Sequence, residues 1–416
     1  MRLDSSPARK LPMPSPSPGR QPETRGEERT GYPRRVKKRR KVFSMRLGLD
    51  MTFLFLVIIL LIIGLIMMFS ASYPSAYAYR NNSFAFLIKQ AGFAAAGIVI
   101  MMVLSYFDYH HFHKLAYPVL AIALLSLVVV LIMPGMPGSG GVKRWIGIGD
   151  ISIQASEIAK FAAVLFLAHF NSKHFKKMDT FKYGVLPSII LVGVISALLI
   201  LEPHYSGIVI IALLIVSMMF ISGVKLRYFI IALALVVTAV IVLAATGMLS
   251  YAMTRLQGWG QALHPETDEL YQLTYQTRNS LYAIGSGGFW GLGLGQSRQK
   301  FLYIPEAQND FVFAVVCEEL GFIGAAIILC IFALLVWRGI TISMRARDKF
   351  GALLGMGLSI QIGLQVILNI MVITDWLPNT GISLPFFSYG GSSLITLLAQ
   401  MGIILSISRT SNLERA

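Results

Sequence analysis

The chain has 416 residues, of which 55% are hydrophobic and only 13% are charged, whereas soluble domains carry about a quarter charged residues. This composition excludes a water-soluble globular protein and predicts a polytopic membrane protein. The net charge of +16 is uneven, because residues 1–44 hold 13 Lys and Arg against 4 Asp and Glu. A basic tail beside a membrane segment suits anionic lipid headgroups and a cytoplasmic location, and does not indicate nucleic acid binding.

The N-terminal tail, residues 1–44, is predicted to be disordered and cytoplasmic. Residues 1–33 are rich in Pro, Ser and charge and show no apolar period. The basic run 34–41 stands directly before the first apolar segment and is typical of a positive-inside topology signal. A binding site for cytosolic proteins is the alternative. No cleavable signal peptide is expected, so the first apolar segment acts as a signal anchor.

Apolar runs of the length that crosses a bilayer, about 20 residues, recur along the chain. They cover residues 48–71, 84–106, 115–134, 153–170, 184–201, 205–222, 226–248, 310–337, 351–373 and 388–408. The predicted fold class is an all-α polytopic membrane protein with about ten transmembrane helices. The helical domain spans 45–409, and a short tail, 410–416, follows it.

The distribution of basic residues predicts the orientation. With the N-terminus inside, the Lys and Arg residues of alternate loops fall on one side, and both termini are cytoplasmic. Two outer loops are long, 135–152 and 249–309, the second lying between helices seven and eight. The glycine-rich run 291–295 in this loop lacks the strand-turn-helix context of a nucleotide loop and predicts a flexible segment.

The first group of candidate residues lies around the fourth apolar segment. Lys143 and Arg144 offer two cations beside Trp145, which suits a pyrophosphate or a lipid headgroup. An interfacial aromatic anchor with snorkelling cations is the alternative. Glu157 and Lys160 are three residues apart on one helical face, so they are predicted to pair inside the membrane. The pair either neutralises two buried charges or shapes a cavity.

The second group lies where the long outer loop meets the eighth apolar segment, in the sequence IPEAQNDF. Asp310, at the apolar boundary, is a candidate general base. The alternative is a helix cap formed by Asn309 or Asp310. Glu306 is a second acid, a metal ligand or a solvated loop residue.

Polar side chains continue inside the apolar segments. Glu318 and Glu319 point about 100° apart on a helix, and at least one should be protonated or pair with a cation. Candidate cations are Arg298, Lys300 and Lys160. A separate stripe recurs every four residues in the ninth segment. Interhelical hydrogen bonding or the lining of a cavity explains this stripe, which consists of Gln361, Gln365 and Asn369. The two cysteines, Cys317 and Cys330, are expected to be free thiols.

Three of these segments resemble the SEDS family of shape, elongation, division and sporulation proteins. The matching sequences are PEAQNDF at 305–311 with EELG at 318–321, LPFFSYGGSS at 384–393, and RWI at 144–146 followed by Gln154, Ser156, Glu157 and Lys160. The PEAQNDF and LPFFSYGGSS sequences are closer to those of the division branch of the family. Three places depart from the family pattern: Gln308 replaces a His, Cys317 replaces a Gly, and Glu202-Pro203-His204 stands where many members have Gln-Pro-Asp.

The resemblance implies a peptidoglycan glycosyltransferase that polymerises lipid II at the outer face of the bacterial cytoplasmic membrane, at the division septum. Asp310 matches the family's essential acid and would deprotonate the 4-hydroxyl of the acceptor sugar, while undecaprenyl pyrophosphate leaves. Residues expected to contact substrate are Lys143, Arg144, Trp145, Arg298, Glu306, Ser388, Tyr389 and Gly390. A divalent cation such as Mg²⁺ is another source of positive charge at the pyrophosphate. The implied partners are a class B penicillin-binding protein, other division proteins and membrane lipids.

Two other functions fit the sequence. A lipid II flippase is compatible with the polytopic form and the intramembrane charges. A non-catalytic scaffold that recruits division proteins through its basic tail is compatible with residues 1–44. The sequence contains no Walker A motif and hence gives no sign of ATP-driven transport.

Overall fold

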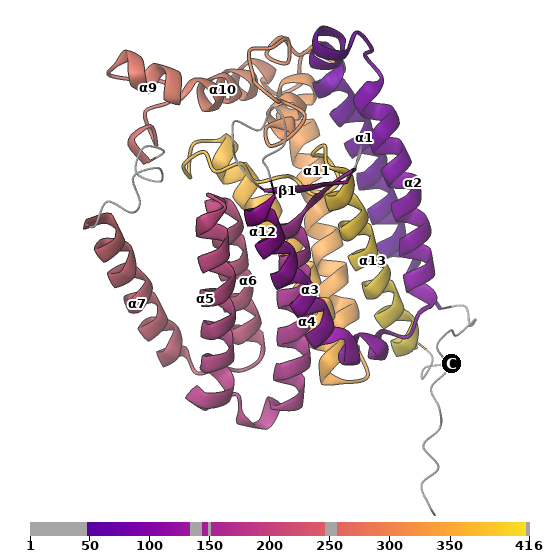
Figure 1. The fold of residues 1–416 in the computed structure, drawn as a ribbon. Coiled ribbons are helices and arrows are strands. Elements are labelled where there is room, and N and C mark those ends of the chain that lie inside the picture. Colours follow the sequence, from indigo (N-terminus) through magenta and orange to yellow (C-terminus); the bar gives the residue numbers. More distant parts are fainter. Residues whose placement is uncertain (1–47, 134–143, 149–150, 246–255, 413–416) are drawn as a thin grey trace, which may run out of the picture. The chain divides into compact units, whose positions relative to one another are not determined.

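The computed structural model describes residues 48–133, 144–148, 151–245 and 256–412 (Figure 1). Within these ranges every predicted apolar segment contains an α-helix. These helices are α1 (Met51–Arg80), α2 (Ala85–Tyr106), α3 (Phe112–Ile132), α4 (Ala155–Lys173), α5 (Leu186–Leu201), α6 (Tyr205–Ile221), α7 (Leu226–Ala245), α11 (Val312–Met344), α12 (Lys349–Ile373) and α13 (Gly391–Asn412). The predicted N-terminal tail, Lys143 and residues 413–416 lie outside the described residues.

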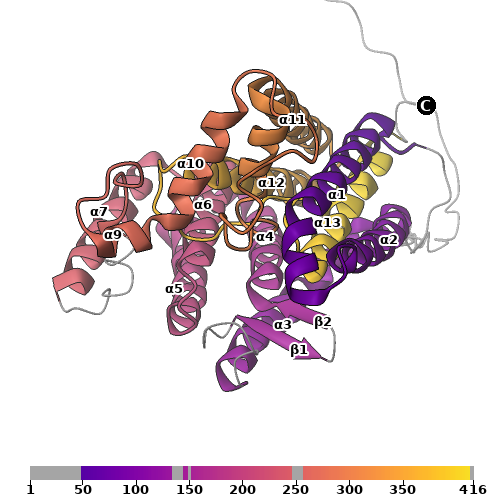
Figure 2. The same ribbon diagram turned by 90° about the horizontal axis from the view of Figure 1, so that it is seen from above.

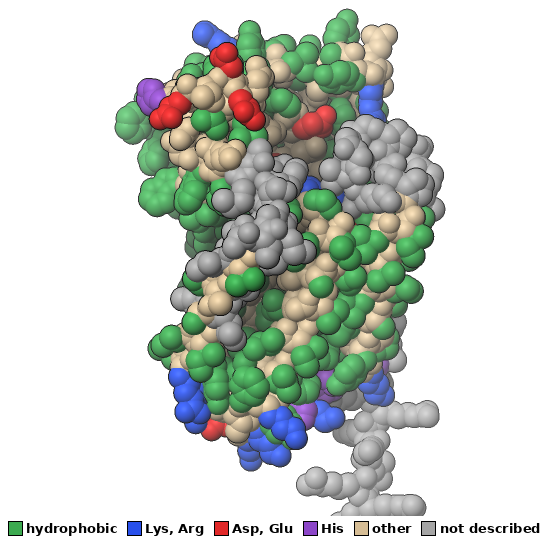
Figure 3. Space-filling model, turned by 60° about the vertical axis from the view of Figure 1, so that its left-hand side comes forward, with side chains coloured by type: hydrophobic (Ala, Val, Ile, Leu, Met, Phe, Trp, Pro, Cys, Tyr) green, Lys and Arg blue, Asp and Glu red, His purple; other side chains and the backbone are tan. Residues whose placement is uncertain are grey.

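The helices are those of a polytopic membrane protein. In the described residues, 7 helical segments are long and apolar enough to cross a membrane, and α6 is a shorter apolar helix. Figure 3 shows a broad hydrophobic surface between one end that carries most of the visible Lys and Arg and an opposite end that carries Asp and Glu. The predicted fold class is therefore confirmed. The number of crossings and the side on which each terminus lies stay predictions.

Several helices extend beyond their apolar runs. The run at 48–71 predicts the first helix, yet α1 continues to Arg80 and ends at Asn81, which has a left-handed backbone. Hydropathy marks the part of a helix that lies in the bilayer, whereas backbone hydrogen bonds continue into the polar region beyond it. At the other end of α1, the Asp50 side chain accepts from the amide of Phe53 and forms an ion pair with Arg338 at 2.7 Å.

Close packing of small residues joins the helices. α13 packs against α2, α11 against α12, and α3 against α4; Figure 2 shows α13 beside α1 and α2. A Cβ on Gly402 of α13 would lie 2.5 Å from the carbonyl oxygen of Met101 of α2. Within a bilayer, where the hydrophobic effect does not drive helices together, such close approach supplies the packing energy.

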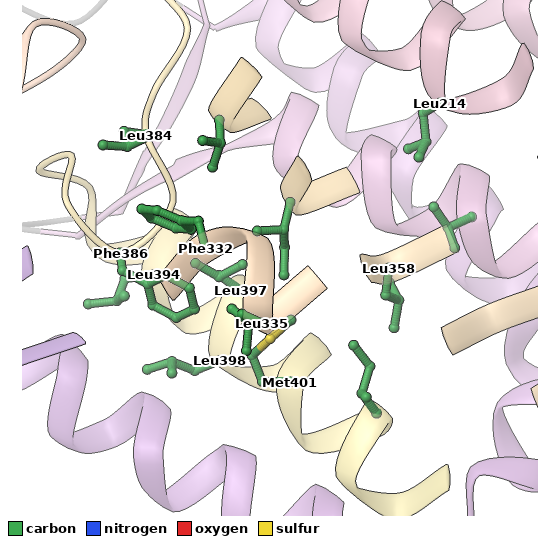
Figure 4. Close-up of a cluster of buried hydrophobic side chains, with 14 of the residues drawn as sticks. Leu214, Phe332, Leu335, Leu358, Leu384, Phe386, Leu394, Leu397, Leu398 and Met401 are labelled. Carbon is green, nitrogen blue, oxygen red and sulfur yellow. The ribbon is translucent and has the colours of Figure 1, made fainter. Parts of the chain in front are cut away.

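A hydrophobic cluster supports the loop that carries the second signature. Phe386 of this loop packs near Phe332 of α11, with ring centroids 6.3 Å apart. Beneath the loop lie Leu394, Leu397 and Met401 of α13, which are buried in the same core (Figure 4). The loop is therefore seated on the helix bundle.

A short β-hairpin precedes α4. The predicted all-α fold did not include this hairpin. β1 (Trp145–Ile148) and β2 (Ile151–Gln154) are antiparallel, with Trp145 opposite Gln154. The fourth apolar segment was expected to start at 153, but α4 starts at Ala155. The reason is local, because residues 151–154 alternate isoleucine with polar residues, a pattern that favours a strand.

The long loop predicted at 249–309 contains α9 (Asp268–Leu273) and α10 (Tyr275–Gly287). α10 buries polar residues, and the Ser280 hydroxyl donates to the carbonyl oxygen of Ile373 at 2.9 Å. The glycine-rich run, predicted to be flexible, is instead held against α11: the amide of Leu292 donates to the carbonyl of Glu318 at 2.9 Å, and that of Gly293 to Glu319 at 3.0 Å. The left-handed backbone of Gly291 and Gly321 permits this approach.

Candidate active site

A polar cavity of about 560 Å³ opens at the end of the bundle that carries the hairpin and the two signature segments. Its volume is typical of a site for a small molecule or a sugar. The walls come from the end of α1, from α2, the hairpin, α4, α12, α13 and the loop at 381–390. Segments far apart in the sequence therefore meet at one site, which we call the central cavity.

Asp310 lines the central cavity at the start of α11. The cap position of α11 is Phe311, which has no side-chain capping bond, so Asp310 lies one residue before the cap. The side-chain amide of Asn369 donates to the backbone carbonyl of Asp310 at 2.8 Å and to that of Ile382 at 2.6 Å. This single amide therefore fixes the segment of Asp310 and the start of the second signature loop on α12.

Gln308, at the position where the family has His, is a structural link between the two signatures. Its side chain is 1% exposed, and its amide donates to the Glu306 carboxylate at 2.8 Å. Its backbone carbonyl accepts from the amide of Tyr389 at 2.8 Å. Glu306 also accepts from Asn309 at 3.1 Å and has a left-handed backbone, with φ 51°. Strained backbone of this kind clusters at functional sites.

The second signature loop is fixed by its own side chains and by α2. The Ser388 hydroxyl accepts from the amide of Leu384 at 2.7 Å. Gln90 of α2 accepts from the amide of Gly390 at 3.2 Å and donates to the carbonyl of Ser388 at 3.4 Å. Phe386 has φ 67°, and its carbonyl lies so close to Gly64 of α1 that a Cβ there would overlap it. Ser388, Tyr389 and Gly390 all line the cavity.

Cations and acids line the same cavity. The cations are Arg80, Lys89 and Arg144, and the acids are Glu157, Glu306 and Asp310. Glu157 and the buried Lys160 form the predicted ion pair, with Nζ and Oε1 2.7 Å apart. Such an arrangement offers a carboxylate that can take a proton and positive charge that can hold an anionic group.

Two of these cations were not predicted from the sequence. Arg80 ends α1 and Lys89 lies early in α2, so both flank the short loop between the first two helices. Two basic residues beside a predicted outer loop are an exception to the positive-inside rule. This exception could have marked them as candidate functional residues from the sequence alone. His204, which also lines the cavity, was noted only as a departure from the family pattern.

Arg298 is not brought to the central cavity. Its side chain is exposed, and its backbone amide donates to Glu318 at 3.0 Å. Trp145 lines the cavity. In the polar stripe on α12, Gln361 and Gln365 line the cavity, which agrees with the second interpretation. Asn369 instead donates to the backbone carbonyls of Asp310 and Ile382, neither of which lies in a helix.

A buried network beside the cavity secures the long loop. Lys300 pairs with Glu319 at 2.8 Å, with side chains 2% and 0% exposed. Glu319 also accepts from the Ser70 hydroxyl of α1 at 2.7 Å and from the amide of Gly295 at 2.9 Å. The prediction that a cation pairs with one of the two adjacent glutamates is confirmed, and the cation is Lys300. Glu318 accepts instead from backbone amides and from the hydroxyl of Ser297.

The turn between α5 and α6 adds two buried titratable groups. Burial raises the pKa of Glu202 to about 8, and Arg144 opposes this shift. Burial, with Arg144 and Lys160 nearby, lowers the pKa of His204 to about 3. A guanidinium nitrogen of Arg144 donates to the carbonyl of Pro203. Glu202 and His204 therefore both lie beside Arg144 in a buried turn that favours their neutral forms.

The described residues do not form a preformed metal cage. No three His, Cys, Asp or Glu side chains in the described ranges lie close enough together to hold a metal ion. Cys317 and Cys330 are free thiols, as expected.

The fold and the cavity define a multi-pass α-helical membrane protein with a polar site built from several helices. A family model described as cell cycle protein, of the FtsW, RodA and SpoVE type, matches residues 51–413. The chain belongs to this family.

Individual relatives agree with this assignment. Stage V sporulation protein E of Bacillus subtilis is 40% identical over 87% of this chain and 97% of its own. A probable peptidoglycan glycosyltransferase FtsW of Geobacter sp. strain M18 is 36% identical, with the same coverage of both chains.

Solved structures share the fold. A chain from a study of the structural coordination of polymerization and crosslinking by a peptidoglycan synthase complex has a TM-score of 0.70 and 25% identity, and covers 88% of this chain and 99% of its own. Thermus thermophilus RodA has a TM-score of 0.62 and 25% identity, and covers 87% of this chain and 97% of its own.

Proposed function

We propose that this protein is a peptidoglycan glycosyltransferase that polymerises lipid II, with Asp310 as the general base. The observation that carries the proposal is the central cavity, where Asp310 and three cations line one polar space. The names of the FtsW relatives, probable peptidoglycan glycosyltransferases, support the reaction class.

In this mechanism Asp310 takes the proton of the acceptor sugar's 4-hydroxyl as its oxygen attacks the anomeric carbon of the lipid-linked donor. The bond from that carbon to the pyrophosphate breaks, and the configuration inverts. The leaving group is already a stable anion, so it needs no second carboxylic acid, unlike the leaving groups of most glycoside hydrolases. Arg80, Lys89 and Arg144 supply the positive charge that stabilises it.

Asn369 and Gln308 hold the base segment in place. Asn369 fixes the backbone of Asp310, and Gln308 orients Glu306. Because Gln308 replaces an imidazole, proton transfer in this mechanism depends on the carboxylate alone. A catalytic group on a backbone segment that is already fixed loses little entropy when substrate binds, which favours reaction.

The site is proposed to face outward, where lipid II is polymerised. The concentration of Lys and Arg at the opposite end of the bundle supports this orientation (Figure 3). A crosslinking enzyme, a class B penicillin-binding protein, is the proposed partner, since one structural relative belongs to a complex that coordinates polymerization and crosslinking. A role in division at the septum is proposed, with support from the family model described as cell cycle protein, and the basic tail is proposed to recruit other division proteins.

The test is lipid II polymerisation by the purified protein with its cognate penicillin-binding protein. Asp310→Asn keeps the size of the side chain but removes the base, so polymer formation should fall by about a hundredfold or more. Asp108→Asn, at another partly buried carboxylate between α2 and α3 and outside the central cavity, is the matched control. Substantial polymer from Asp310→Asn would contradict the assignment. Transfer of lipid II across vesicles without polymer would support a flippase instead.

A further inference from the structure

A second cavity, of about 380 Å³, is lined by residues that neighbour those of the central cavity on two stretches of chain. On one, Pro305 lines the second cavity and Glu306 the central one; on the other, Asn379 lines the second and Gly381 the central one. The two linings therefore come within one or two residues of each other along the chain.

The second cavity presents amide and hydroxyl side chains together with one carboxylate, Asp375. Amide side chains come from Gln272, Gln276 and Asn379, and hydroxyls from Thr274 and Thr277. Amides and hydroxyls both donate and accept hydrogen bonds, as do the hydroxyl and acetamido groups of amino sugars. No Lys or Arg occurs among the described residues that line it, whereas the central cavity has three. The central cavity thus suits a pyrophosphate, whereas the second, with amides, hydroxyls and one carboxylate but no described cation, suits the hydroxyl groups of a sugar chain.

An aromatic platform completes the second cavity. The indole nitrogen of Trp259 donates to the backbone carbonyl of Asp375 at 3.2 Å, which fixes the ring. The side chain nevertheless remains 48% exposed, and Tyr275 lines the same cavity. Aromatic rings bring a large apolar surface at little conformational cost and pack on apolar faces such as the C–H face of a sugar ring.

A third cavity, of about 780 Å³, continues the same surface. It shares Gln272 and Leu273 with the second cavity and adds Gln257, Gln261, Thr267 and Glu269 among its polar residues. The side-chain oxygen of Gln261 is buried and accepts no hydrogen bond from the described residues. The amide-rich lining therefore continues from the second cavity into the third, which offers a polymer more contacts than a single sugar could use.

We propose that the second and third cavities bind the amino-sugar chain of the growing glycan next to the sugar that reacts in the central cavity. This inference rests on the proposed function and names the part of the product that the protein holds between additions. Two hydrogen bonds connect this surface to the catalytic segment: Asn379 donates to Gln276 at 3.0 Å, and Gln276 donates to the carbonyl of Pro305 at 3.0 Å. A bound chain thus contacts the residues that position the first signature.

The first experiment measures sugar binding without chemistry. The full chain in lipid nanodiscs is titrated with chitotetraose, a β-1,4-linked tetramer of N-acetylglucosamine, and followed by saturation-transfer NMR. Trp259→Ala should weaken binding about tenfold, and Gln272→Ala should weaken it several-fold. Gln272 is exposed, so its replacement tests the proposal even where loss of Trp259 disturbs folding. Trp290→Ala, which removes an 82% exposed indole that lines none of the three cavities, is the control.

Asp310→Asn should bind the tetramer as the natural chain does, because binding needs no proton transfer. If the natural chain makes no polymer but the sugar binds with this pattern, the glycan subsite stands and the proposed function fails. Absence of tetramer binding to the natural chain, or equal affinity in Trp259→Ala and Gln272→Ala, overturns the subsite.

The second experiment measures product length. A strand held between additions grows further before release, so Trp259→Ala and Gln272→Ala should shorten the glycan made from lipid II, while Trp290→Ala should not. An unchanged length distribution in both cavity variants, with polymer still made, contradicts the proposal and leaves the proposed function intact.

Discussion

The side-chain amide of Asn369 donates to the backbone carbonyl of Asp310 at 2.8 Å. The same nitrogen donates to Ile382 at 2.6 Å, so one residue of α12 joins the two signature segments, which are about 70 residues apart in the chain. The carboxylate therefore stands on a backbone that α12 fixes, and its position depends on a residue outside either signature.

Replacing Asn369 with Leu should therefore lower activity by displacing the Asp310 carboxylate. Two carbonyls would lose their donor, at a cost of about 1–3 kcal/mol for each group left buried and unpaired. A shift of Asp310 by about 1 Å lowers the rate by about a hundredfold. The measurement is lipid II polymerisation per folded protein. Asn171→Leu is the matched control, because this buried amide donates to Ser222 at 2.8 Å far from the cavity. Equal activity losses in both variants would contradict the positioning role.

Gly381 is predicted to leave room for the same carboxylate. A Cβ at this position would lie 2.8 Å from Oδ2 of Asp310 and near no other group outside that side chain. Gly381→Ala should lower polymerisation about tenfold or more by displacing the carboxylate. The residue also has φ +70°, which costs a residue with a Cβ about 1–2 kcal/mol.

A matched variant separates the two effects. Gly223 has φ +84°, and a Cβ there would meet nothing within 4 Å. Gly223→Ala should therefore lose similar stability and keep its activity. Thermal unfolding measures the stability of both variants, and polymerisation measures their activity. If activity falls in proportion to stability in both, crowding at Asp310 is not the cause.

The Lys300–Glu319 pair gives a stability prediction. Both side chains are buried, so Lys300→Met leaves an uncompensated carboxylate and should cost about 3–5 kcal/mol. The double variant Lys300→Met with Glu319→Gln should recover much of this loss. Lys225→Met is the control, since Lys225 pairs with Asp179 at a surface where both are about half exposed, and it should cost about 0–1 kcal/mol. The free energy of unfolding is measured for the purified Lys300→Met and Lys225→Met variants. Equal losses in the two would contradict a stabilising contribution from the buried pair.

Much of the fold was predictable because hydropathy is a local property. Runs of apolar residues located the helices, and a three-residue spacing located the Glu157–Lys160 pair. The hairpin at 145–154 was missed because its strands are four residues each, too short to stand out beside an apolar helix. The extension of α1 to Arg80 was missed because hydropathy does not report where backbone hydrogen bonds end.

The site was only partly predictable, for a different reason. Family motifs singled out Asp310 and the loop at 384–393, but the members of the cavity depend on which helices meet. Lys89 and Arg80 carry no motif and come to the cavity only through the packing of α1 and α2. Arg298 is close to the signature in sequence, yet its side chain is exposed outside the cavity because its backbone is bound to Glu318. Contacts of this kind are set by tertiary structure.

The turn between α5 and α6 is predicted to make stability depend on pH. Glu202 is 1% exposed, and neither of its carboxylate oxygens has a hydrogen-bond partner among the described residues. Burial raises its pKa from 4.5 to about 8. The folded protein therefore binds this proton more tightly than the unfolded chain does. The resulting stability is complete below pH 4.5 and is lost as the pH rises through about 8.

Glu202→Gln removes that dependence, since the amide stays neutral at every pH. Between about pH 6 and about pH 9 the melting temperature of the natural chain should fall relative to that of Glu202→Gln, with the two closest at the acidic end. Burial lowers the pKa of His204 to about 3, but His204 and Arg144 are unchanged in Glu202→Gln, so their contributions to the pH dependence cancel in this comparison. Glu266→Gln, at an exposed position, is the control and should follow the natural chain. If the melting temperatures of the natural chain and Glu202→Gln fall in parallel across this range, Glu202 is already ionised in the folded protein and the predicted pH dependence is wrong.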